Sequence, residues 1–190
     1  MTRTLTQMGA QTGTRLALVA ALVAGSLGLA ASSALAQGQR GPEIKTYVNA
    51  KHGFSLTYST DEFTPLPMAT ADGFQAVSKD GKARLLAGTI ANFDGKTLEE
   101  YRIFLIGASY PGAKIHYAPV RATWFVLTGT KTDGTSFYQR VNLVCGGRGI
   151  NSWAVIFPYD EEYVYSTLIE QIHKDYSIGE PNCDAMAMTQ

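Results

Sequence analysis

Tyr138 and Arg140 are the polar side chains whose types and spacing best suit a binding site. They are two residues apart in a segment whose other face carries Phe137, Val141 and Leu143, so the period of a strand places them on one face. A charged side chain beneath a helix needs a partner, whereas one at the edge of a sheet does not. Arg140 therefore either pairs within the fold or contacts a ligand.

Trp124 belongs to a neighbouring apolar segment, and we expect it to join Tyr138 and Arg140 if a ligand site lies between the sheet and a loop. Structural pairing of Arg140 within the fold is the interpretation we prefer, and a ligand contact is the alternative. Replacing Arg140 with Met separates the two, because a lost ligand with unchanged melting indicates function and a lower melting temperature alone indicates structure.

Histidines offer little for catalysis or metal binding. His52, His116 and His173 are scattered, and no two stand at metal-ligand spacing. We expect His52 at the surface and His173 solvated among the polar residues of the last helix. No Gly-x-Ser-x-Gly turn is present either. The sequence thus predicts no catalytic residue, no metal site and no cofactor.

Cys145 and Cys183 are the two cysteines of the chain. In an exported protein such a pair is more often a disulfide than a metal site or a nucleophile. Gly146 to Gly149 follow Cys145 and combine three glycines with Arg148. Because a strand rather than a helix follows them, they favour a hairpin loop over a phosphate cradle.

Residues 1–36 have the pattern of an export signal. Arg3 and Arg15 precede an apolar run, and Ala34 and Ala36 supply the small-x-small pattern that signal peptidase reads, so we expect cleavage after Ala36. An uncleaved membrane anchor is the alternative, but Gly25 and other small residues interrupt the run. The product is expected to be periplasmic or secreted, without a stable membrane anchor.

Cleavage leaves 154 residues, which we interpret as a flexible lead-in at 37–45 and a single domain at 46–190. All 20 aromatic residues fall in this mature part, so the core is expected to be rich in rings. Its net charge is −2, which is too weak and too mixed to indicate nucleic acid as a partner.

The mature chain alternates short apolar segments with turn residues, which is typical of an antiparallel sheet. Asp-Gly pairs begin at Asp72, Asp80, Asp94 and Asp133 and favour tight turns. The segments expected to form strands are 54–59, 74–78, 83–91, 114–120, 123–130, 136–145 and 150–157.

Two helices are expected. Thr97 and Glu100 have the spacing of a capping box before a helix that ends near Ser109, and Asp160 suits the N-cap of a final helix. The segments 124–127 and 153–157 are apolar on both faces, so helices must pack on both sides of the sheet.

The segment that runs from Tyr47 and Asn49 through Gly53-Phe54-Ser55-Leu56 to Tyr58 resembles the start of PsbP-like (Mog/PsbP/DcrB-type) domains. Later elements are similar as well, namely Asp80-Gly81-Lys82-Ala83, Thr97-Leu98-Glu99-Glu100-Tyr101, Trp124-Phe125-Val126-x-x-Gly129 and Phe137-Tyr138. The resemblance implies an α+β fold, an α/β/α sandwich around a central antiparallel sheet. Ser59 stands where a proline is common, and no motif carries over a known partner of the family.

The resemblance also implies a domain used mainly for binding or as an assembly accessory. Together with the export signal and the absence of a convergent catalytic set, it favours an exported, non-enzymatic binding or accessory protein of the cell envelope. Its partner would be an unidentified envelope protein or a small molecule. The alternative is a small-molecule-binding protein or enzyme whose site, formed by Tyr138, Arg140 and Trp124, lies between the sheet and the loops.

Overall fold

A computed structural model describes residues 41–68 and 73–184, which belong to one unit spanning residues 39–190. The predicted leader, residues 1–36, lies outside the described residues, as do the first residues of the lead-in. The elements in chain order are β1 (Ile44–Asn49), β2 (Phe54–Ser59), β3 (Phe63–Pro65), β4 (Gly73–Ser78), β5 (Arg84–Ala91), α1 (Leu98–Ser109), β6 (Lys114–Tyr117), β7 (Trp124–Thr130), β8 (Thr135–Val144), β9 (Gly149–Pro158), α2 (Glu162–Asp175) and β10 (Ser177–Ile178).

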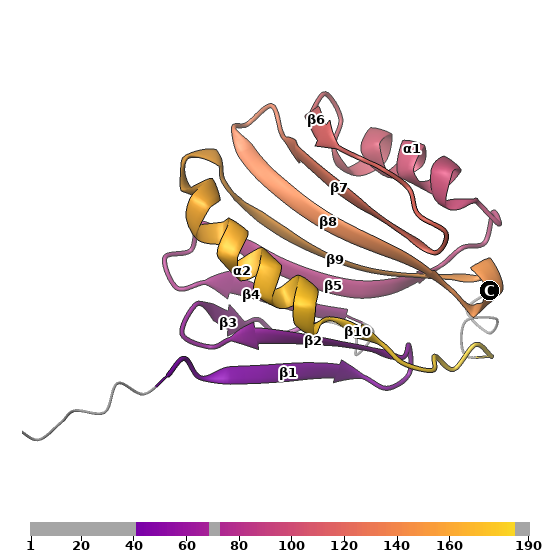
Figure 1. Ribbon diagram of the computed structural model, residues 1–190, viewed down its shortest axis with the longest axis horizontal. Coiled ribbons are helices and arrows are strands. Elements are labelled where there is room, and N and C mark those ends of the chain that lie inside the picture. The colour runs from indigo at the N-terminus through magenta and orange to yellow at the C-terminus, as the bar shows by residue number, and fades with distance from the viewer. Residues whose placement is uncertain (1–40, 69–72, 185–190) are drawn as a thin grey trace, which may run out of the picture. The chain divides into compact units, whose positions relative to one another are not determined.

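Seven strands form the central antiparallel sheet, in the order β3-β4-β5-β9-β8-β7-β6 (Figure 1). The longest pairings join β9 to β5 on one side and to β8 on the other. Each predicted strand is present, with ends shifted by a few residues. The turn at Asp80 and Gly81 joins β4 to β5, and Gly81 has the positive φ that favours glycine there.

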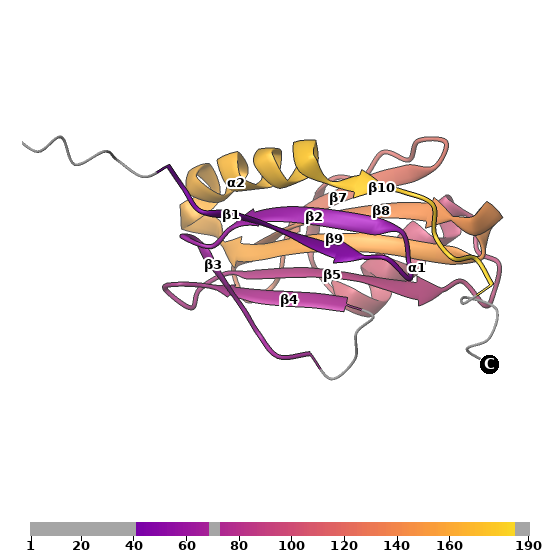
Figure 2. The same ribbon diagram turned by 90° about the horizontal axis from the view of Figure 1, so that it is seen from below.

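A smaller sheet, β1-β2-β10, lies on the side of the central sheet that α2 covers (Figure 2). The strand β1 begins at Ile44, earlier than the end of the predicted lead-in at residue 45, because Ile44 and Lys45 pair with Ser59 and Tyr58 of β2. Pairing across sequence, rather than local pattern, decides where this strand begins.

One helix packs on each face of the central sheet, as the two-sided apolar segments predicted. The helix α2 and β2 cover one face through a core that includes Trp153 and Phe157, and α1 covers the other through Phe125 and Phe137 (Figure 2). The fold is thus an α+β sandwich with a central antiparallel sheet. The helix α1 contacts β7 and leaves the same face of β4 and β5 only partly covered, so Leu86 is half-buried.

The local sequence predicted the start of one helix correctly and that of the other incorrectly. Thr97 and Glu100 form the predicted capping box, in which each side chain accepts a hydrogen bond from the other residue's backbone N–H. Asp160 was the wrong N-cap: a 3-10 turn at Tyr159–Glu161 comes first, and α2 begins at Glu162.

Cys145 and Cys183 form the predicted disulfide, with their Cα atoms 5.4 Å apart. The bond joins the end of β8 to the tail that follows α2, and it is typical of proteins in an oxidising compartment. In the described part of the chain, no helix has the length and apolarity that crossing a membrane requires.

Candidate functional site

The strand β8 places Tyr138, Arg140 and Asn142 on the sheet face that α2 partly covers. Arg140 lies opposite Val126 of β7 and Trp153 of β9 in the strand register. Tyr138 and Arg140 are half-buried, and Asn142 is buried. The alternation of β8 therefore brings a cation and a hydroxyl together beneath the C-terminal half of the last helix.

Arg140 is held by rings and neutral polar groups. Its guanidinium carbon lies 4.7 Å from the centre of the Trp124 ring and 5.5 Å from that of Tyr176. Its Nε donates to Asn142 Oδ1 at 3.2 Å. Among the described residues no carboxylate pairs with Arg140, so its charge is not neutralised by a salt bridge within this part of the chain.

His173 of α2 bridges the two β8 side chains. Its Nδ1 lies 2.7 Å from the Tyr138 hydroxyl, and its Nε2 lies 3.2 Å from Arg140 Nη1. A guanidinium has only donors, so Arg140 donates to Nε2, and the neutral ring carries its proton on Nδ1, which donates to the Tyr138 oxygen. Burial, together with the charge of Arg140, lowers the pKa of His173 and favours this neutral form.

Aromatic rings form the layer beneath these groups. Tyr138 stacks on Trp153 with ring centres 5.0 Å apart, and Trp153 in turn contacts Tyr176. Burial raises the pKa of Tyr138 to about 12, so its hydroxyl keeps its proton at neutral pH. Within the described part, Trp153 Nε1 and the Tyr176 hydroxyl are buried without a hydrogen-bond partner.

A groove adjoins this cluster at Tyr138. It has a volume of about 240 Å³ and runs between α2 and the strands β7 and β8. Phe157 and Ile169 give it an apolar side, and Glu162 and Glu170 line it from α2. The Arg140 site, which we define as Trp124, Tyr138, Arg140 and His173, is therefore next to a space that can hold part of a ligand.

The three residues chosen from the sequence, Tyr138, Arg140 and Trp124, do lie together. His173 was missed, because it was expected to be solvated; this was wrong. The helical spacing held a signal, since His173 follows the buried Ile169 by four residues and so shares its face. The expectation for His52 was also wrong: it is 6% exposed, within the turn that follows β1.

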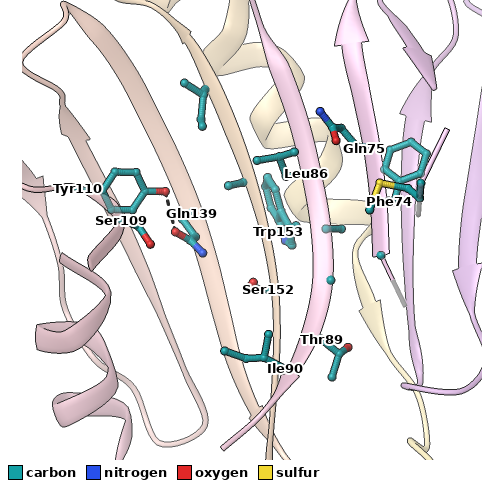
Figure 3. Close-up of a pocket in the computed structure, with 16 residues that line it drawn as sticks. Phe74, Gln75, Leu86, Thr89, Ile90, Ser109, Tyr110, Gln139, Ser152 and Trp153 are labelled. Atoms are coloured by element: carbon teal, nitrogen blue, oxygen red, sulfur yellow. Dashed lines mark hydrogen bonds between the residues drawn. The ribbon is translucent and has the colours of Figure 1, made fainter. Parts of the chain in front are cut away.

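The other face of the sheet holds a pocket of about 470 Å³, shown in Figure 3. It lies over the part of β4, β5 and β9 that α1 leaves partly covered, and its lining residues carry no charge. The Tyr110 hydroxyl donates to Gln139 Oε1 at 2.7 Å at one side of it. Ser152 and Gln139 precede Trp153 and Arg140 in their strands, so the two sites are on opposite faces.

Neither a family model nor a curated protein sequence matches the chain. Solved structures do. The cyanobacterial PsbP (CyanoP) of Synechocystis sp. PCC 6803 is similar with a TM-score of 0.56 and 14% identity, over 74% of this chain and 95% of that one. The Ran-binding protein Mog1p of Saccharomyces cerevisiae is similar with a TM-score of 0.53 and 7% identity, over 77% of this chain and 99% of that one. LpqN of Mycobacterium tuberculosis, which is involved in cell envelope biogenesis, is similar with a TM-score of 0.50 and 14% identity, over 72% of this chain and 92% of that one.

These likenesses support the class of the fold, an α+β sandwich with a central antiparallel sheet and one helix on each face. Within that class, the fold is that of PsbP-like domains, as the sequence resemblance implied. At this level of identity the likeness establishes the fold and leaves the role of the Arg140 site to its own chemistry.

Proposed function

We propose that this chain is an exported, non-enzymatic binding or accessory protein of the cell envelope, and that it holds its ligand at the Arg140 site. The observation that carries the proposal is a half-buried guanidinium without a carboxylate partner among the described residues. Buried charges are normally paired, and the described partners of the partly buried Arg140 are all neutral, which supports a ligand as the partner of its charge.

The arrangement of His173 favours binding over proton transfer. Both of its ring nitrogens are engaged, one by Tyr138 and one by Arg140, so neither is free to take a proton from a bound molecule. A histidine in this position orients its neighbours rather than acting as a general base.

The disulfide and the fold support the location and the role. A disulfide between Cys145 and Cys183 suits the periplasm or the extracellular space. LpqN is described as involved in cell envelope biogenesis, and Mog1p as a Ran-binding protein; both share the fold. We extend from them only the general role of a binding or accessory domain, and the partner is an envelope protein or a small molecule.

The test is to add an envelope extract of the producing organism to the isotope-labelled exported protein and follow its NMR signals. We expect shifts at Trp124, Arg140 and His173 that vanish in Arg140→Met. Arg121→Met is the matched control, because Arg121 is exposed and lies three residues before Trp124. Equal shifts in both variants, or none at this site, would contradict the proposal, as would a turnover that one polar substitution abolishes.

A second candidate function uses the pocket of Figure 3. Its uncharged lining and the Gln139 amide suit a neutral small molecule, which would bind between β5 and α1. Replacing Ser152 with Trp fills this pocket. If that variant, rather than Arg140→Met, removes the NMR shifts, the neutral pocket is the binding site.

A further inference from the structure

Arg140 has hydrogen-bond donors that its described contacts do not use. A guanidinium carries five N–H groups, and the described contacts use one on Nε and one on Nη1. Both N–H groups of Nη2 and one of Nη1 are left without a partner in the described residues. Adjacent free donors of this kind match the two oxygens of a carboxylate or phosphate.

Tyr138 supplies a further donor next to them. Because His173 donates to the Tyr138 oxygen, the hydroxyl proton of Tyr138 is not used in that hydrogen bond. Tyr138 and Arg140 point to the same face of β8 and are both tied to one histidine ring. His173 thus holds a hydroxyl at one ring nitrogen and a guanidinium at the other, and each of the two groups keeps at least one proton that these hydrogen bonds do not use.

The aromatic rings around Arg140 strengthen the hydrogen bonds that these donors can make to a ligand. Trp124 and Tyr176 lie against the guanidinium and exclude water from part of it, so a charge-assisted hydrogen bond here is stronger than on an open surface. They also hold the guanidinium in place before a ligand arrives, which reduces the entropy that binding costs.

The adjoining groove limits the rest of the ligand. Phe157 and Ile169 favour an apolar body beside Tyr138, whereas Glu162 and Glu170 repel a second negative charge. A small molecule with one anionic head and an uncharged body satisfies both parts of the site. A dianion such as a phosphate monoester fits the donors but not the groove.

We propose that the Arg140 site binds a small organic monocarboxylate, whose carboxylate accepts hydrogen bonds from Arg140 and Tyr138 and whose apolar body lies in the groove beside α2. This assignment rests on the proposed binding function and adds the chemical class of the ligand to it.

Four ring compounds of matched size test the assignment by calorimetric titration of the exported protein at pH 7.5: benzoate, benzamide, phenyl phosphate and benzylamine. We expect benzoate to bind at least about tenfold more tightly than benzamide, its neutral isostere, because only benzoate makes charge-assisted hydrogen bonds. Phenyl phosphate should be weaker than benzoate, and benzylamine should not bind.

Variants then locate the site. Arg140→Met should lower benzoate affinity at least about tenfold, and Tyr138→Phe, which removes only a hydroxyl, by several-fold. Arg121→Met should leave it unchanged. If Arg140→Met does not fold, Tyr138→Phe alone still decides, because its ring and packing are retained.

Equal affinity for benzoate and benzamide, full benzoate affinity in folded Arg140→Met or in Tyr138→Phe, or no benzoate binding at millimolar concentration would overturn the assignment. A phenyl phosphate affinity above that of benzoate would also overturn it and indicate a phosphate ligand. Extract-induced NMR shifts at Arg140 combined with equal benzoate and benzamide binding would reject the carboxylate and retain the binding function. An extract that leaves Arg140 unaffected would reject the binding function itself.

Discussion

The two faces of the central sheet differ in the chemistry they present, although the same strands build both. On the α2 face, Arg140 lies among Trp124, Tyr138 and His173 without a carboxylate partner in the described residues. On the α1 face, the neighbouring residue Gln139 is hydrogen-bonded to Tyr110 beside an uncharged pocket. One step along β8 thus changes a cationic site into a neutral one, because successive side chains point to opposite faces.

The contrast shows why the cationic face is the better candidate for function. Gln139 and Tyr110 satisfy each other, so their pairing is explained by the fold alone. The unused donors of Arg140 are not explained in that way. Variants that affect one face and leave the other unchanged therefore test the comparison directly.

The largest expected change in stability comes from removing the disulfide, and it should alter neither face of the sheet. Replacing both Cys145 and Cys183 with Ser opens a bridge that spans 38 residues, and the chain-entropy model predicts a loss of about 4 kcal/mol in the free energy of unfolding. Urea unfolding measures the loss. Benzoate affinity of the folded variant should not change, and a change would show that the tail beyond α2 supports the Arg140 site.

The second-largest change in stability is expected on the α1 face, at the hydrogen bond between Tyr110 and Gln139. Tyr110→Phe keeps the ring stacked on Phe137 but leaves Gln139 Oε1 buried without its donor, which costs about 1–3 kcal/mol in the free energy of unfolding. Urea unfolding should detect this cost while benzoate affinity stays at the wild-type value. Weakened benzoate binding would mean that the two faces are coupled through β8.

Arg140→Met should have the opposite profile. We expect its free energy of unfolding to fall by at most about 1 kcal/mol, which is the size of a cation–π contact at a partly exposed position. Benzoate affinity should fall at least about tenfold. Thermal melting and calorimetry give the two values. A large loss of stability with unchanged affinity would make Arg140 a structural residue.

The smallest effect is a pH dependence from His173. Burial and Arg140 lower its pKa in the folded state below the ordinary value of 6.5, so the unfolded state binds more protons. The stabilisation from the neutral ring is therefore complete above about pH 6.5 and is lost as the pH falls through the folded-state value. Melting temperatures at pH 7.5 and 5 should differ more for the wild type than for His173→Gln; equal differences would refute the shift.

Local patterns predicted those parts of the molecule that local physics decides. Thr97 and Glu100 are three residues apart, and a capping box needs nothing else. Tyr138 and Arg140 share a face because strands have a period of two, and Cys145 and Cys183 had no other cysteine to pair with.

Positions decided by packing over long distances in sequence were missed. The environment of His173 depends on where α2 crosses β8, some 33 residues earlier in the chain. The burial of His52 depends on Asn151, whose side chain donates to the His52 carbonyl oxygen from the distant strand β9. No local pattern around His52 contains this information, and for His173 the four-residue spacing from Ile169 indicated the helix face but not the contacts with β8, so both were assigned to the surface.

Tryptophan fluorescence tests the central claim most directly, because the only two tryptophans of the chain, Trp124 and Trp153, both lie beside Arg140 or Tyr138. Benzoate should produce a saturable change in the emission of the wild type and of Arg121→Met, and none in Arg140→Met. A saturable change that persists in Arg140→Met, or that benzamide reproduces at the same concentration, would contradict an anion site built around Arg140.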